Sequence, residues 1–154
     1  MQLEAQLRIL GRSAAENGLS PEVMRQAVNP VLLAFARTLK HRQYHLLQSS
    51  RGDWLLTTLA RADDPTREKT VIYAFATKKA AIDWQTPAPD PLPTLEIPVT
   101  HLLFQLLALD RVDSIIFLDN PRDRDRGREI PRSDLQATIQ KQLRKLRSIP
   151  PDIA

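Results

Sequence analysis

The chain has 154 residues, of which 22 are Lys or Arg and 18 are Asp or Glu, so its formal net charge at pH 7 is +4. It contains no Cys, which excludes a disulfide framework, a thiolate metal cage and a cysteine nucleophile. A hydrophobic fraction of 42% with so small a net charge excludes a disordered chain. The length matches one globular domain of roughly 150 residues.

The N-terminal segment lacks the pattern of a secretory leader, because Glu4 and Arg8 interrupt the apolar core that such a leader needs. The longest apolar stretch, residues 102–109, contains Gln105 and is far shorter than the ~18 residues of a membrane span. The absence of Cys also fits a reducing compartment. We therefore expect a cytoplasmic protein with no membrane partner.

Helices are predicted for the N-terminal part of the chain. Residues 1–17 carry apolar side chains at spacings of four, three and four, which share one helical face: Leu3, Leu7, Leu10 and Ala14. Ser-Pro at residues 20–21 is typical of a helix start. Asn-Pro at residues 29–30 repeats this signal and predicts a third helix over residues 30–40. The alternative is a single helix that is kinked at this Asn-Pro pair.

Strand-forming side chains follow from residue 42. Residues 44–48 and 54–59 are rich in them, and the turn-forming cluster between the two, which includes Gly52, predicts a β-hairpin. A polar turn over residues 61–69 leads to a third strand at residues 70–76. Three strands with short connections predict an antiparallel meander.

A short helix and a proline-rich segment come next. Thr77 is the expected N-cap of a helix over residues 78–84. Residues 86–98 contain five prolines, a density that predicts an extended connector without regular hydrogen bonding. The alternative is a lid or recognition strip, because a stiff segment loses little entropy on binding. Residues 95–97 are expected to add one short edge strand, which ends at Pro98.

The last third of the chain predicts a helix, a strand and a helix. An apolar helix ends at about Leu109, and the continuous apolar run at residues 114–118 is typical of a central strand covered on both faces. A mixed-charge loop follows at residues 122–130. Residues 131–149 carry one apolar stripe, at spacings of four, four and three: Leu135, Ile139, Leu143 and Leu146.

Together these elements predict a single α+β domain, residues 1–154. It comprises a helical N-terminal segment (residues 1–40), an α+β core (42–121), a charged loop (122–130) and a C-terminal helix (131–149). The sheet is expected to be mainly antiparallel, with four or five strands. The N-terminal helices and the basic, amphipathic C-terminal helix are expected to flank it.

Several short structural motifs follow one another between Trp54 and Pro121. They are a strand at residues 71–76, a Thr-capped helix that ends in Trp84, an amphipathic helix at 102–109 and an apolar strand that ends in Asn120-Pro121. In these motifs, residues 54–121 resemble the enhanced-serine-sensitivity (SseB-like) family of small bacterial domains. That family usually has a glycine soon after Asn-Pro, where this chain has Arg122. The resemblance implies an α/β-type sheet domain that acts as an interaction or regulatory module, and it supplies no catalytic residue.

The sequence contains no complete cofactor or metal motif. With only four glycines the chain has no Gly-rich phosphate-binding loop and no nucleophile elbow, so no cofactor is expected. His41 and His45 would share a face only on a continuous helix, and no nearby carboxylate completes a metal site. They are therefore interpreted as ordinary surface or cap residues.

Asp119 is the one candidate for a catalytic acid, because it directly follows an apolar strand. Asp-Asn-Pro at residues 119–121 is equally typical of a plain turn. Acid–base chemistry would also need a second titratable group beside Asp119. The candidates for that second group are Glu96, Asp110 and Asp113.

Basic side chains are the main candidates for binding a partner. Arg122, Arg124 and Arg126 alternate with acidic residues; they form either a solvated loop or a docking loop, because Arg offers planar donors to carboxylates and phosphates. The C-terminal helix carries four more basic residues, on the side opposite its apolar stripe: Lys141, Arg144, Lys145 and Arg147. These four form either a solvated face or a contact surface for nucleic-acid phosphates.

The sequence therefore predicts a non-enzymatic module that binds another protein or regulates it. Sequence-independent binding of RNA or DNA by the basic C-terminal helix is the alternative, and a small hydrolase that uses Asp119 is a second alternative.

Overall fold

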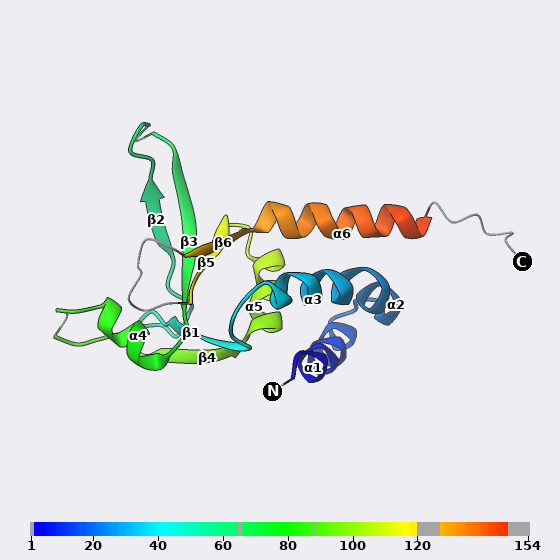
Figure 1. Ribbon diagram of the computed structural model, residues 1–154, viewed down its shortest axis with the longest axis horizontal. Helices are drawn as coiled ribbons and strands as arrows, with labels where there is room; N and C mark the ends of the chain where they lie inside the picture. The colour runs from blue at the N-terminus through cyan, green and yellow to red at the C-terminus, as the bar shows by residue number, and fades with distance from the viewer. Residues whose placement is uncertain (1, 65, 88, 120–126, 148–154) are drawn as a thin grey trace, which may run out of the picture.

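The computed structural model describes residues 2–64, 66–87, 89–119 and 127–147, and Figure 1 shows how their helices and strands are arranged. The helical segments, including one π-helical turn named η1, are α1 (Leu3–Glu16), α2 (Pro21–Val23), η1 (Met24–Val28), α3 (Asn29–Arg37), α4 (Lys78–Trp84), α5 (Val99–Ala108) and α6 (Arg132–Arg147). The strands are β1 (Gln43–Leu47), β2 (Thr57–Ala60), β3 (Glu68–Phe75), β4 (Thr94–Pro98), β5 (Ser114–Leu118) and β6 (Arg128–Pro131). The predicted α+β class is confirmed.

The predicted break between two helices at Asn29-Pro30 is wrong, because α2, η1 and α3 follow one another without interruption. The π-helical turn accommodates the proline: the Asn29 N–H donates to the Met24 carbonyl, five residues back. Pro30 has no N–H, so the carbonyl of Gln26, four residues before it, loses its usual helical donor. The side chain of Gln142 in α6 donates to this carbonyl instead, at 3.3 Å.

The strands form one mixed sheet in the order β4-β1-β3-β5-β6, with β2 also paired to β3. β3 and β5 run parallel, with Ile72 opposite Ile115, and the other pairs are antiparallel. The sheet is thus mainly antiparallel, as predicted, but it has six strands and one parallel pair. The missed strand, β6, overlaps the end of the predicted charged loop, and Ile130 is the only buried residue within this strand.

The predicted meander of three strands is also wrong. β1 and β2 do not form a hairpin; they lie one after the other along the same edge of β3, with His45 opposite Phe75 and Thr57 opposite Val71. The other edge of β1 is paired with β4. Residues 48–56 form the loop between β1 and β2, which is closed by an isolated bridge between Gln48 and Trp54.

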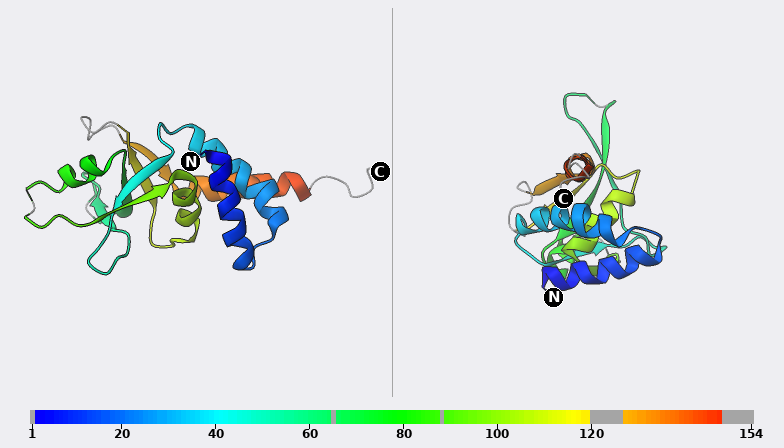
Figure 2. Two further views of the ribbon diagram at one scale, coloured as in Figure 1. Left: turned by 90° about the horizontal axis from the view of Figure 1, so that it is seen from below. Right: turned by 90° about the vertical axis from the view of Figure 1, so that its right-hand side faces the viewer.

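Two layers of helices cover the sheet unequally (Figures 1 and 2). The larger core lies under α1, α3, α5 and α6 and contains the buried side chains of Tyr44, Ile72 and Phe117. The smaller one lies on the opposite face, where Phe75 and Leu118 pack against α4. β5 is therefore covered on both faces, which confirms the prediction of a central strand.

The capped helix α4 and the edge strand β4 agree closely with the sequence analysis. The Ala80 N–H donates to the Thr77 hydroxyl at 3.0 Å, so Thr77 is the N-cap.

α6 has a buried Leu135 near its start, and the rest of its apolar stripe is only half-buried. In Figure 1 this helix extends away from the sheet beside α3.

Three neighbouring strands are joined by a polar cluster. The Glu129 carboxylate lies 2.8 Å from the Lys69 ammonium and accepts a hydrogen bond of 2.6 Å from the Ser114 hydroxyl. Partial burial raises the pKa of Glu129, but the hydrogen bonds from Lys69 and Ser114 and the charge of Lys69 outweigh it, so this pKa lies below its ordinary value of 4.5.

We expect Glu129→Gln to remove part of the acid sensitivity of the fold. Because its folded pKa is lowered, Glu129 contributes stability that is present above pH 4.5 and is lost as the pH falls below it. Urea unfolding at pH 7 and at pH 3.5 measures the effect, with Glu68→Gln as the exposed control on β3. Equal destabilisation by Glu129→Gln at both pH values would contradict the prediction.

Candidate functional site

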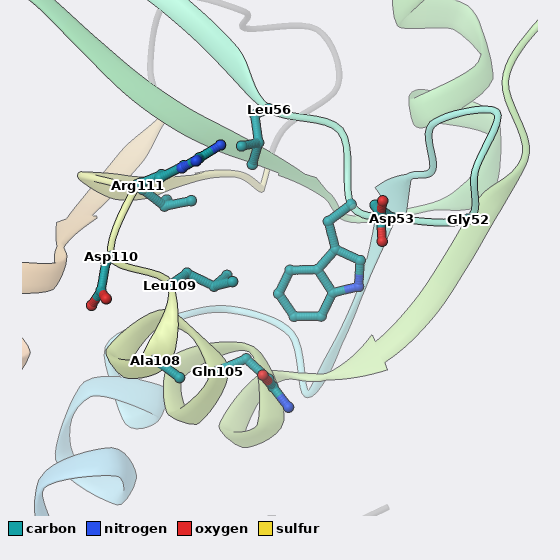
Figure 3. Close-up of a pocket in the computed structure, with 10 residues that line it drawn as sticks. Gly52, Asp53, Leu56, Gln105, Ala108, Leu109, Asp110 and Arg111 are labelled. Carbon is teal, nitrogen blue, oxygen red and sulfur yellow. The ribbon is translucent and has the colours of Figure 1, made fainter.

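The loop over residues 48–56 and the C-terminal end of α5 enclose an open pocket of about 520 Å³ (Figure 3). Volumes of ~300–1,000 Å³ are typical of ligand pockets. The apolar walls come from two segments that are more than fifty positions apart in the sequence. One contributes Trp54 and Leu56, and the other contributes Ala108, Leu109 and Val112. We call this cavity the Trp54 pocket.

The loop wall is shaped by local turn chemistry. Gly52 has a φ of 85°, which favours glycine, and its N–H donates to the Ser49 carbonyl at 2.9 Å. The side chains of Trp54 and Leu55 then pack on opposite faces of the sheet. Trp54 packs against the large core and Leu55 packs against the small one. The packing of Trp54 against the large core holds its indole at the pocket.

The other wall is held by Arg132 at the start of α6. Its Nε donates to the Val112 carbonyl at 3.2 Å and its guanidinium also donates to the Asp110 carbonyl at 3.3 Å. The Asp110 carboxylate, which points away from the pocket in Figure 3, lies 3.5 Å from the same guanidinium. The link between α5 and β5 is therefore fixed from outside the pocket.

Opposite charges mark the two ends of the Trp54 pocket. Figure 3 shows Arg111 beside Leu56 at one end and Asp53 at the other. Both residues are exposed, and neither forms an ion pair with any residue that the structure describes. The pocket can thus hold an apolar group whose flanks carry a negative charge near Arg111 and a positive charge near Asp53.

Of the residues that line this pocket, only Asp110 was a candidate from the sequence, as a possible acid–base partner of Asp119. Residues 49–53 were interpreted as a tight turn between paired strands. Gly52 and Trp54 were a signal of a packed loop in the sequence, since a large aromatic side chain directly after a turn is expected to pack against another part of the molecule. Its partners on α5 could not be read from the sequence.

The predicted basic side chains of α6 lie on its exposed face. Lys141, Arg144, Lys145 and Arg147 are all exposed. Among the described residues, no carboxylate forms an ion pair with Lys141, Arg144 or Arg147. Of the predicted loop residues, Arg122, Arg124 and Arg126 lie outside the described part of the chain.

The Asp119 carboxylate accepts a hydrogen bond from the hydroxyl of Tyr44, a buried residue of β1. Burial raises the pKa of Tyr44 well above its ordinary value, and the hydrogen bond to Asp119 and the charge of Asp119 raise it further. Tyr44 therefore stays a neutral donor. Asp119 does not line the Trp54 pocket, so its position gives the hydrolase hypothesis no support.

The two histidines have separate surroundings. The His41 ring lies edge-on to the ring of Tyr44, whereas the His45 imidazole lies 3.7 Å from the Glu96 carboxylate. Across the described ranges, no group of three or more His, Asp or Glu side chains could hold a metal ion.

The proline segment is tied to the body of the molecule. The Leu92 N–H donates to the Gln85 side-chain oxygen at 2.6 Å, and the Gln48 N–H donates to the Pro93 carbonyl at 2.9 Å. These bonds support its interpretation as a connector.

No protein-family model and no curated protein sequence matches the chain. The resemblance of residues 54–121 to the SseB-like family therefore stays a prediction. None of the helices in the described part of the chain combines the length and the hydropathy needed to cross a lipid bilayer.

Proposed function

We propose that the protein is a non-enzymatic, cytoplasmic binding module that captures a peptide segment of another protein in the Trp54 pocket. The observation that supports this most directly is the pocket itself, an apolar cavity of about 520 Å³ with opposite charges at its ends that form no ion pair with a described residue. Such a cavity accepts one large apolar side chain, which is how most peptide interfaces concentrate their binding energy. An acidic residue beside that side chain would meet Arg111, and a basic residue on its other flank would meet Asp53.

The absence of a hydrolytic arrangement in this pocket favours binding over catalysis. The pocket carries Asp53, Asp110 and Arg111 but no Ser, Cys or His, so no hydroxyl or thiol nucleophile of these types and no imidazole base lines its described walls. Asp110 is already engaged by Arg132. The remaining charges suit recognition of a charged peptide.

Panning a phage-displayed library of random 12-residue peptides on the protein tests the proposal. We expect a consensus in which one large apolar residue is flanked by an acidic residue on one side and a basic residue on the other. Leu56→Glu should weaken the selected peptides at least tenfold, because it places a carboxylate in the apolar wall. Fluorescence anisotropy with a labelled consensus peptide measures this change.

Leu95→Glu is the matched control, because Leu95 is 37% exposed, close to the 43% of Leu56, and lies on β4 outside the pocket. It should leave affinity unchanged. Arg111→Glu should exchange the preferred acidic flank for a basic one. A library without a consensus, or peptides that bind Leu56→Glu as tightly as the native protein, would contradict the proposal.

Sequence-independent binding of RNA or DNA is the second candidate function. The observation that favours it is the exposed face of α6, on which Lys141, Arg144 and Arg147 have no acidic partner among the described residues. Such a face contacts phosphates without reading bases. Against it, no aromatic residue follows Phe117 in the chain to stack on bases.

Anisotropy of a labelled 20-nucleotide RNA at 50 and 200 mM salt tests this candidate. If it is right, affinity falls steeply with salt, by about 0.7 log units per phosphate contact for each log unit of salt for a single strand. The triple variant Lys141→Glu/Arg144→Glu/Arg147→Glu then loses binding, whereas a control with the same charge change elsewhere, Lys40→Glu/Arg51→Glu/Lys78→Glu, retains most of it. Binding that is insensitive to salt, or absent, excludes this function.

A further inference from the structure

A second groove, of about 570 Å³, lies between α1 and the continuous helix formed by α2, η1 and α3. These helices lie side by side on the far side of the sheet from α4 (Figures 1 and 2). The groove shares no lining residue with the Trp54 pocket. It is therefore a separate surface, and what binds there does not depend on the function proposed above.

The floor of this groove is apolar and open. It is formed by Leu7 of α1 and Met24 of η1, which are both buried. Gly11 lies one turn after Leu7 on α1 and also lines the groove, and a Cβ built at Gly11 would meet no atom within 4 Å. A glycine inside a helix weakens it, and no described neighbour requires its small size. The space above Gly11 is the room that a second helix needs to approach α1 closely.

The rim of the groove is positively charged on the α1 side. Arg8 and Arg12 lie one helical turn apart, and neither forms an ion pair with a described residue. On the opposite wall, Arg25 is already bonded to Glu22, at 2.7 Å. Glu4 lies at one end of the groove. The unpaired charge that faces an incoming ligand is therefore the pair on α1.

One polar atom of the wall lacks a hydrogen bond. The Oδ1 atom of Asn29 is buried and has no partner among the described residues, and Asn29 lines the groove. A buried acceptor without a donor is costly.

We infer that this groove binds an acidic amphipathic helix of a partner protein. Its apolar face would lie over Gly11 between Leu7 and Met24, and two carboxylates one turn apart would pair with Arg8 and Arg12, since helices in grooves present residues at that spacing. Opposite charges at this spacing also set the register of the bound helix.

A second copy of the chain does not supply such a helix. Among the described helices, α1 carries Glu4 and Glu16, three turns apart, while α2, α4 and α6 carry one acidic residue each, and α3, η1 and α5 carry none. None of them therefore presents two carboxylates one turn apart. The occupant has to come from another protein.

A phage-displayed library of 18-residue helical peptides tests the inference. Its apolar stripe is fixed as Leu and Ala, and its outer positions vary among Glu, Gln and Lys. We expect the selected peptides to carry Glu residues one turn apart. Gly11→Leu should weaken them at least tenfold, because the new side chain fills the groove. The same change should leave the thermal midpoint equal or higher, because Leu favours the helix more than Gly does.

Charge reversal provides the second measurement. Arg8→Glu/Arg12→Glu should bind the Lys version of a selected peptide more tightly than its Glu version, whereas the control Lys40→Glu/Arg51→Glu should keep the native preference. Leu56→Glu should not affect these peptides, which separates this surface from the Trp54 pocket. Selection without a preference for Glu, or unchanged affinity in Gly11→Leu, would overturn the inference.

Discussion

Phe117→Ala is expected to lower the free energy of unfolding by about 3–5 kcal/mol. Phe117 lies in the middle of β5, is fully buried, and packs edge-on against the ring of Tyr44 with centroids 4.8 Å apart. Because β5 is covered on both faces, the neighbouring side chains cannot move in to fill the cavity completely. This loss is large beside the total stability of about 5–15 kcal/mol that is typical of a domain.

Urea unfolding of the native protein and the variant measures this loss. The control is Ile82→Ala on α4, where the side chain is 37% exposed and the expected cost is less than about 1 kcal/mol. A cost for Phe117→Ala as small as that of the control would mean that β5 is not the central strand of the sheet.

Tyr44→Phe is expected to cost about 1–3 kcal/mol, because it leaves buried polar groups without their partner. The Tyr44 hydroxyl accepts a hydrogen bond from the His41 N–H at 3.3 Å and donates one to the Asp119 carboxylate. It thereby joins the start of β1 to the end of β5. A double-mutant cycle with Asp119→Asn should give a coupling energy of about 0.5–3 kcal/mol; additive costs would contradict a direct bond.

The Tyr44 hydroxyl should also make the native protein sensitive to high pH. Its folded pKa is raised above the ordinary value of 10.0, chiefly by burial and then by Asp119. The stability it contributes is therefore present below pH 10 and is lost as the pH rises above 10. Urea unfolding at pH 8 and at pH 11 should show a smaller difference between the native protein and Tyr44→Phe at the higher pH.

Within the sheet, the wrong predictions occur where two segments could pair in more than one way. Residues 49–53 do form a local turn, with a bridge between Gln48 and Trp54, so the local chemistry was predicted correctly. The strands beyond this turn separate because both edges of β1 are already paired, one with β4 and the other with β3. Adjacency in sequence favours a hairpin, but burial of side chains on both faces of the sheet determines the pairing.

The candidate sites show the same limit. The exposed basic face of α6 could be predicted, because it follows from helical periodicity alone. The Trp54 pocket and the groove between α1 and the α2–η1–α3 helix could not be predicted, since each is formed by two segments that meet only after folding. The polar bond between Tyr44 and Asp119 was missed for the same reason, as these residues are 75 positions apart.

Local sequence is enough to predict the elements whose causes lie within a few residues. Thr77 caps α4 over Lys78–Trp84, the apolar run over Ser114–Leu118 forms the central strand, and β4 ends at Pro98. Capping bonds, proline sterics and side-chain periodicity act at this short range. Only the tertiary structure shows that β3 pairs in parallel with β5 and that β1 and β2 follow one another along one edge of β3. The same is true of both cavities. Backbone hydrogen bonds are alike in every strand, so only the packing of distant side chains selects which strands meet and which spaces stay open.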